Sequence, residues 1–143
     1  LFFLAGVRCI IMTIMNMKMS SASGLVTVVK DLEKSKKFYG DLGFVFKKEM
    51  PGISAIAYLN WFWIELLLET EVVSDEFKPD IKISSKGAGQ YLHIKVEDVD
   101  DFYKGVVDMG YKPMDEPLDR PWGHREFILA DPDGYKIVFF NKR

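Results

Sequence analysis

The chain has 143 residues, of which 48% are hydrophobic, 14% aromatic and 28% charged, a composition that favours a single folded domain and excludes a disordered chain. The formal charge of −2 lacks the basic excess of a nucleic-acid-binding protein. The single cysteine, Cys9, excludes a disulfide scaffold or a cysteine-rich zinc site and favours a reducing, cytoplasmic location.

Residues 1–19 read as an apolar N-terminal extension ahead of a domain expected over residues 20–143. Arg8 interrupts the apolar run, which is then shorter than the ~20 residues of a membrane span. No basic residue precedes the run, as one would in a secretory signal. Three interpretations stay open: an extension without a role in the chemistry, an added strand or helix covering a dimer surface, or a targeting segment. No membrane or nucleic-acid partner is expected.

The first module is expected over about residues 24–70. A strand at 25–29 leads to Asp31, whose carboxylate suits the N-cap of a helix. Strands at 44–49, 53–59 and 61–68 follow, after Gly43 ends the helix. The helix has one buried stripe at helical spacing, formed by Leu32, Ser35, Phe38, Tyr39 and Leu42.

A polar linker over about residues 70–89 precedes the second module, expected at about residues 90–142. Its strand at 91–96 is followed by the helix cap Asp98 and by strands at 111–114, 125–129 and 135–140. Asp131 to Gly134 is a turn signal before the last strand. The helix stripe consists of Val99, Phe102, Tyr103, Val106 and Met109.

The two modules repeat one pattern. The segment Val29-Lys30-Asp31-Leu32 aligns with Val96-Glu97-Asp98-Val99 at an offset of 67, and the last strands align at an offset of 73. A period of this length is typical of a duplicated half-domain and not of a solenoid. The sequence therefore predicts an α+β fold built from two βαβββ modules.

Two segments carry a resemblance to a known family, at residues 29–39 and 121–134 (PWGHREFILADPDG). The chain resembles the vicinal oxygen chelate superfamily of glyoxalases, bleomycin resistance proteins and extradiol dioxygenases. The resemblance implies a curved, partly closed mixed sheet around a cup. It is strongest for the bleomycin-resistance branch, which implies a homodimer that captures a small molecule, as in antibiotic resistance.

The resemblance also implies where a divalent metal would bind, with ligands at Gly24, Glu65, Tyr91 and Val138. Only Glu65 is a good donor, so no metal cofactor is expected. His93 shares the strand face of Tyr91 but lies about 7 Å further along, too far to replace it. A rearranged site of Glu65, His93 and His124 stays an alternative.

Strand alternation separates the side chains under the helices from those that face the cup. The first group comprises Ile64, Leu66, Leu92, Ile94, Val96, Ile137 and Phe139. The candidate ligand-binding residues are Trp63, Glu65, Tyr91, His93, Trp122, Val138 and Phe140.

Each candidate has a structural alternative. Glu65 could instead pair with Lys95 or Arg125, and His93 could be a hydrogen-bonded structural histidine. Trp63 could belong to the core. The Arg125-Glu126 pair and the Lys34–Lys37 cluster are expected to be solvated, and Asp133-Gly134 is expected to form a turn only.

These observations favour a protein that binds a small, cationic or aromatic molecule in a cup without the usual metal, rather than an enzyme. The alternative is a metal-dependent lyase, isomerase or dioxygenase with a rearranged site. In a metal-free enzyme, Glu65 and His93 would be the catalytic acid–base pair. A third reading is a module whose own side chains fill the cup.

Overall fold

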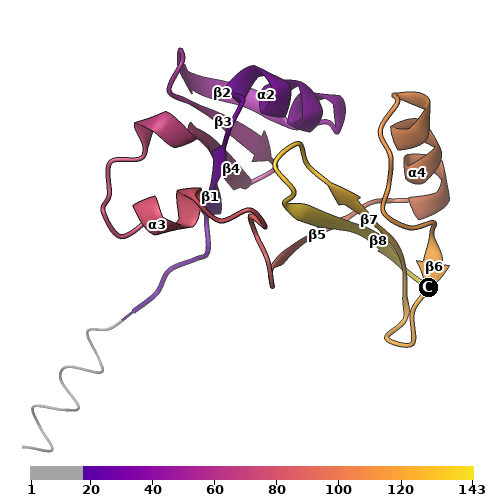
Figure 1. The fold of residues 1–143 in the computed structure, drawn as a ribbon. Helices are drawn as coiled ribbons and strands as arrows, with labels where there is room; N and C mark the ends of the chain where they lie inside the picture. Colours follow the sequence, from indigo (N-terminus) through magenta and orange to yellow (C-terminus); the bar gives the residue numbers. More distant parts are fainter. Residues whose placement is uncertain (1–17) are drawn as a thin grey trace, which may run out of the picture.

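The computed structural model describes residues 18–143, so the predicted extension lies outside the described residues except for its last two positions. The first module contains β1 (Gly24–Val29), α2 (Leu32–Asp41), β2 (Val45–Met50), β3 (Ser54–Leu59) and β4 (Phe62–Leu68). These strands form a sheet in the order β1-β4-β3-β2, in which β1 runs parallel to β4 (Figure 1).

The second module repeats this arrangement with β5 (Tyr91–Lys95), α4 (Val99–Asp108), β6 (Leu118–Asp119), β7 (His124–Ala130) and β8 (Lys136–Lys142). Its sheet has the order β5-β8-β7-β6, and β5 runs parallel to β8. The predicted α+β fold of two βαβββ modules is therefore confirmed. Within residues 18–143, the strands form two mixed sheets and no closed barrel.

The strand register confirms the repeat offsets. Val26 pairs with Glu65 across β1 and β4, and His93 pairs with Val138 across β5 and β8, which reproduces the offsets of 67 and 73. Both helices have ten residues. The carboxylate of Asp31 accepts a hydrogen bond from the amide of Lys34 at 3.0 Å, and its counterpart Asp98 accepts one from Asp101 at 2.9 Å.

One predicted strand is wrong. Residues 111–114 form no strand, and the edge strand of the second sheet is the short β6, which pairs antiparallel with β7. The amide of Met114 still donates to the carbonyl of Ile128 at 2.8 Å. Pro113 and Pro117 have no N–H to donate, which prevents a continuous ladder along this stretch.

The helix-facing sides of both sheets belong to one hydrophobic core. The predicted inward residues Ile64, Leu66, Ile137 and Phe139 are buried, and Leu92, Ile94 and Val96 pack against them. Among the helix residues predicted to be buried, only Met109 is exposed, because it lies at the C-cap of α4.

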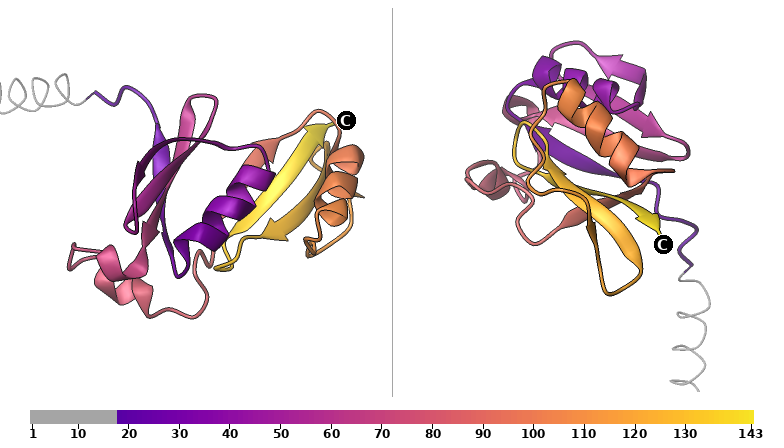
Figure 2. Two further views of the ribbon diagram at one scale, coloured as in Figure 1. Left: turned by 90° about the horizontal axis from the view of Figure 1, so that it is seen from above. Right: turned by 90° about the vertical axis from the view of Figure 1, so that its right-hand side faces the viewer.

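The β7–β8 turn of the second module docks on the first module. The hydroxyl of Tyr39 on α2 donates to Oδ2 of Asp131 at 2.8 Å, and both side chains are buried. Oδ1 of Asp133 accepts a hydrogen bond from the amide of Lys30 at 3.0 Å. In Figure 2 (left), α2 lies between the strands of the first module and this hairpin. The prediction that Asp133 serves the turn alone is therefore wrong.

Tyr135, directly after this turn, satisfies the edge of β1. Its hydroxyl oxygen accepts from the amide of Val28 at 3.2 Å and donates to the carbonyl of the same residue at 3.1 Å. Edge-strand groups left unpaired would be exposed to water or to another chain. One phenol thus replaces a neighbouring strand at this point of the first sheet.

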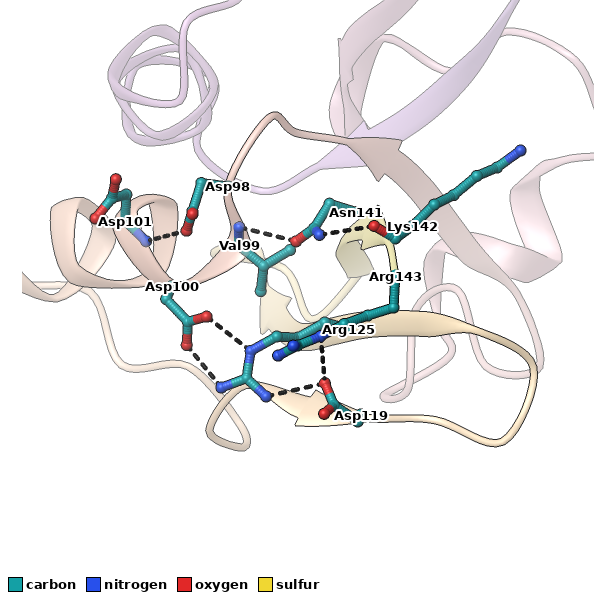
Figure 3. A network of polar contacts seen from close by, with 9 residues as sticks. All are labelled: Asp98, Val99, Asp100, Asp101, Asp119, Arg125, Asn141, Lys142 and Arg143. Atoms are coloured by element: carbon teal, nitrogen blue, oxygen red, sulfur yellow. Dashed lines mark hydrogen bonds and ion pairs between the residues drawn. The ribbon is translucent and has the colours of Figure 1, made fainter.

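A charged network fastens α4 to the second sheet (Figure 3). The guanidinium of Arg125 on β7 contacts both carboxylate oxygens of Asp100 at 2.7 Å and Oδ1 of Asp119 at 3.1 Å. The hydrogen bonds from Arg125 hold the pKa of the Asp100 carboxyl below its usual value. This two-pronged geometry is the strong form of an ion pair, so Arg125 serves the fold and is not available to Glu65.

Candidate functional site

A cavity of about 720 Å³ lies against the first sheet, on the face opposite α2. Its floor is formed by Val26 and Val28 on β1 and by Glu65 and Leu67 on β4. Strand alternation, which places these four side chains on one face, makes this floor predictable from the sequence. The empty volume also argues against the reading in which the chain fills its own cup.

The wall of the cavity is formed by the segment predicted as a linker. Figure 1 shows the course of this segment between β4 and β5. It contains a 3-10 helix, η1 (Glu69–Glu71), and a short helix, α3 (Lys78–Ile81). Its residues at the cavity include Val72, Val73, Ser74, Phe77, Asp80, Ile83 and Lys86. The apolar residues among them, set in a polar stretch, were the signal that could have identified this wall.

Near the C-terminal end of this segment, Lys86 forms an ion pair with Glu69 at the other end. Its ammonium group lies 3.1 Å from Oε2 of Glu69, and its side chain is 3% exposed. Because a buried ammonium is unfavourable without a counter-charge, this pair holds the two ends of the segment together. The segment between them is thereby kept over the floor of the cavity.

Glu65 is the charged group on the floor. Its side chain is half-buried, and within residues 18–143 its carboxylate makes neither a hydrogen bond nor an ion pair. The alternative in which Glu65 pairs with Lys95 or Arg125 is not observed among the described residues, and the guanidinium of Arg125 is held by Asp100 and Asp119. Glu69 neutralises Lys86, so among the described residues the charges left at the cavity are the carboxylates of Glu65 and Asp80. Two negative charges favour a cationic group.

The four positions at which the resemblance implies metal ligands do not form a fitting donor set. A Cβ atom on Gly24 would lie 2.3 Å from Cδ2 of Trp63, so the indole already occupies the space that a ligand side chain would need. Val138 has no donor, and the ammonium of Lys136 lies 5.8 Å from the ring centre of Tyr91, where it would repel a cation. Glu65 alone offers an anionic oxygen.

The residues of the alternative, rearranged metal site come from both modules. Glu65 lies at the cavity of the first module, whereas His93 on β5 and His124 on β7 belong to the second sheet. Among residues 18–143, no three His, Cys, Asp or Glu side chains are placed to hold a metal ion.

The remaining candidate residues do not line the 720 Å³ cavity. Trp63 packs on Gly24, and Tyr91 lies at a smaller cavity of about 180 Å³ between β1 and the β5–β8 pair. Val138 is buried and Trp122 is exposed. Glu65 therefore lies at the 720 Å³ cavity, and Tyr91 lies at the smaller one.

On the second sheet, the candidate residues Phe140 and His93 lie near each other and near His124. The ring of Phe140 stacks on His124 with centroids 4.3 Å apart, and the centroids of His93 and Phe140 are 5.9 Å apart. His93 is exposed, contrary to the structural alternative of a hydrogen-bonded histidine. Glu126, expected to be solvated, is only 5% exposed.

The buried carboxylate of Glu126 accepts two hydrogen bonds and lies near a histidine ring. Oε1 accepts from Nε of Arg120 at 3.1 Å, and Oε2 accepts from Nε1 of Trp122 at 3.3 Å. Nδ1 of His124 lies 3.9 Å from the same Oε2. Strand alternation from His124 could have placed Glu126 on the cup face, but the identity of its partners depends on a loop that the sequence does not fix.

No helix within residues 18–143 is both long and apolar enough to cross a membrane.

The fold and the paired modules define a duplicated βαβββ protein with a cavity on the face of the first sheet opposite α2. The sequence model of the Glyoxalase/Bleomycin resistance protein/Dioxygenase superfamily matches residues 23–139. The chain therefore belongs to this superfamily, as its resemblance implied. Its place in the bleomycin-resistance branch stays a prediction.

Solved structures share this fold. A glyoxalase/bleomycin resistance protein/dioxygenase from Nocardioides superposes with a TM-score of 0.74 at 20% identity, covering 96% of this chain and 93% of that one. An integron cassette protein from V. cholerae has a TM-score of 0.65 at 26% identity, with coverages of 87% and 96%. A lactoylglutathione lyase from Agrobacterium tumefaciens reaches 0.65 at 16% identity, with coverages of 87% and 95%. No curated protein matches the chain.

Proposed function

We propose that the chain binds a small, cationic, largely apolar molecule in the cavity of the first module, without a divalent metal. The observation that carries this proposal is the carboxylate of Glu65, which lies without a polar partner from residues 18–143 on a floor of Val26, Val28 and Leu67. A half-buried carboxylate in such surroundings gains free energy when a bound cation replaces the lost water.

The size and lining of the cavity suit this role. Ligand sites of about 300–1,000 Å³ with apolar walls and few polar groups are typical of small-molecule binding. The cavity combines an apolar floor with an excess of negative charge from Glu65 and Asp80. The mode of action would be stoichiometric capture, as in a resistance protein, rather than turnover.

We further propose that the protein acts as a homodimer in the cytoplasm. The large exposed side chains of Trp61 and Tyr91 support an association between copies. The single cysteine suits a reducing compartment. Sedimentation equilibrium would give the mass of one chain if the dimer proposal is wrong.

The binding proposal is tested with a matched pair of ligands, protonated 1-naphthylmethylamine and the neutral 1-naphthalenemethanol. Calorimetry is expected to show the amine binding about tenfold more tightly, as expected for a charge-assisted hydrogen bond to a carboxylate. Glu65→Gln should remove this preference, whereas Glu116→Gln, an exposed carboxylate outside the cavity, should leave it intact. Equal affinity for both ligands in the unaltered protein would refute the proposal.

Metal independence is tested separately on protein purified without chelator. Metal analysis should find less than stoichiometric divalent metal, and EDTA should leave amine binding unchanged. Stoichiometric metal together with turnover of methylglyoxal–thiol adducts or catechols would instead establish a metal-dependent enzyme.

A further inference from the structure

The 720 Å³ cavity continues past the outer edge of the first sheet. Four of the residues that line it, Val26, Gly87, Gln90 and Tyr135, also line the smaller cavity of about 180 Å³. The two cavities therefore adjoin, and these four residues lie where one passes into the other.

The smaller cavity lies along the edge of β1, between the two modules. The first module contributes Leu25 and Ile64 to its lining, and the second contributes Leu92 and Ile137. Ile64 and Ile137 are each 1% exposed and belong to the hydrophobic core. The inner end of this cavity is therefore bounded by aliphatic side chains from both modules.

The hydroxyl groups that line the smaller cavity are already engaged. Tyr39 donates to Asp131 at 2.8 Å, and the hydroxyl of Thr27 contacts the carbonyl oxygen of Glu65 at 3.5 Å. The hydroxyl of Tyr135 is held by the backbone of β1. A polar group entering here would lose its hydrogen bonds to water without replacement, so the inner end favours hydrocarbon.

The two cavities differ in charge. Glu65 and Asp80 line the larger one, whereas Lys136 lines the smaller one, with its ammonium 5.8 Å from the ring centre of Tyr91. A cationic group is thus attracted to the larger cavity and repelled from the smaller one. This difference sets the orientation of a ligand that occupies both.

Glu65 is close to the passage between the cavities. It pairs in register with Val26, which lines both of them, and neighbouring strands are about 4.8 Å apart. The side chain of Val26 is 49% exposed, so apolar surface is uncovered at this point. A ligand whose cationic group contacts Glu65 can therefore extend directly past Val26 into the smaller cavity.

We propose that the ligand is an amphiphile, with an ammonium head at Glu65 and an unbranched hydrocarbon chain in the smaller cavity between the modules. It rests on the proposed function, whose cation is the head of this amphiphile. A methylene group takes about 30 Å³, as a water molecule does in the liquid, so a cavity of about 180 Å³ holds roughly six. Because the chain contacts both modules, its binding also strengthens their docking.

The first test compares n-hexylammonium with ethylammonium by calorimetry. The longer ion should bind at least about tenfold more tightly, because full burial of each of its four additional methylenes is worth up to about fourfold. Leu92→Phe, which fills the smaller cavity from the second module, should reduce this ratio to about threefold or less, since the chain then has less space in which to be buried.

The matched control is Leu118→Phe, an exposed position on β6 outside both cavities, which should keep the full ratio. A ratio that survives Leu92→Phe, or that falls equally in both variants, would overturn the amphiphile.

The second test uses the unaltered protein and stands even if Leu92→Phe does not fold. In its complex with n-hexylammonium, nuclear Overhauser contacts are expected between the terminal methyl group of the ligand and the methyl groups of Leu25 and Leu92. Contacts of that methyl group with Val72 and Phe77 instead would place the chain along the wall of the larger cavity and overturn the proposal.

Binding of 1-hexanol separates the amphiphile from the proposed function. If n-hexylammonium binds no more tightly than 1-hexanol, both are overturned. If the ammonium ion is preferred but ethylammonium binds as tightly as n-hexylammonium, the cation site stands and the chain site between the modules is overturned.

Discussion

The hydroxyl of Tyr39, on the helix of the first module, donates a 2.8 Å hydrogen bond to Asp131, in the last turn of the second. Both groups are buried, and they are 92 positions apart in the sequence. Burial and the neighbouring carboxylate raise the pKa of the Tyr39 phenol, so this group remains a donor throughout the accessible pH range. The contact therefore acts as a permanent connection between the modules.

Tyr39→Phe should destabilise the protein by about 1–3 kcal/mol, because Oδ2 of Asp131 then stays buried without its donor. Urea unfolding measures this loss. Tyr111→Phe is the matched control, since that hydroxyl donates to Asp41 at 2.6 Å at a partly exposed site where water can replace it. Equal losses in the two variants would contradict a special role for the Tyr39 contact.

Asp131 gives stability a defined pH dependence. Burial raises the pKa of its carboxyl above the ordinary value of 3.8, so the folded state holds this proton more tightly than the unfolded chain. The resulting stabilisation is present at low pH and is lost as pH rises from about 4 through the raised pKa. Relative to Asp131→Asn, the unaltered protein should lose stability across that window in urea titrations. If the free energy of unfolding of the unaltered protein instead rises relative to that of Asp131→Asn as the pH increases, the raised pKa of Asp131 is refuted.

Gly24 is predicted to tolerate no side chain. A Cβ there would lie 2.3 Å from both the indole and the carbonyl oxygen of Trp63. Gly24→Ala should therefore cost about 1–3 kcal/mol, and Trp63→Ala should relieve only part of it because the backbone contact remains. Gly105→Ala, in α4 with no atom nearby, should instead stabilise by about 0.5–1 kcal/mol. Thermal unfolding distinguishes Gly24→Ala from Gly105→Ala. If Gly24→Ala does not lower the stability, position 24 has room for a side chain and could hold a ligand residue.

The ion pair of Lys86 and Glu69 should respond unequally to the loss of its members. Glu69→Gln leaves a buried ammonium without its counter-charge, whereas Lys86→Met leaves a partly exposed carboxylate and an apolar chain. The first variant should lose about 1–3 kcal/mol and the second less. Hydrogen exchange should also show faster opening of residues 72–85 in Glu69→Gln. Identical exchange in both variants would mean that the pair does not hold the cavity wall.

Much of the fold could be predicted because the signals are local and occur twice. Asp31 and Asp98 each cap a helix of the same length, and Gly43 and Gly110 follow those helices with positive φ, as their sequence positions indicate. Strand alternation correctly assigned Ile64 and Ile137 to the core. The prediction of a strand at residues 111–114 was wrong. It rested on the strand that follows the helix in the first module, but in the second module two prolines interrupt the corresponding stretch.

The candidate site was less predictable because its key contacts join residues far apart in the chain. Glu65 was recognisable as a charge on an apolar strand, but its actual neighbours come from the segment after β4, whose conformation depends on the Glu69–Lys86 pair. Glu126 was taken for a surface residue because its partners Arg120 and Trp122 belong to a loop without periodicity. Neither environment has a signature in the spacing of residues.

The docking of the β7–β8 turn has a consequence for synthesis on the ribosome. Lys30 and Val28, near the start of the domain, take their partners from Asp133 and Tyr135, which are 103 and 107 residues later. The first module thus emerges with the edge of β1 uncovered and keeps it so until almost the whole chain has been made. During that interval the edge of β1 can pair with strands of other nascent chains that are being made on the same mRNA. Slow translation of the C-terminal hairpin should therefore promote aggregation.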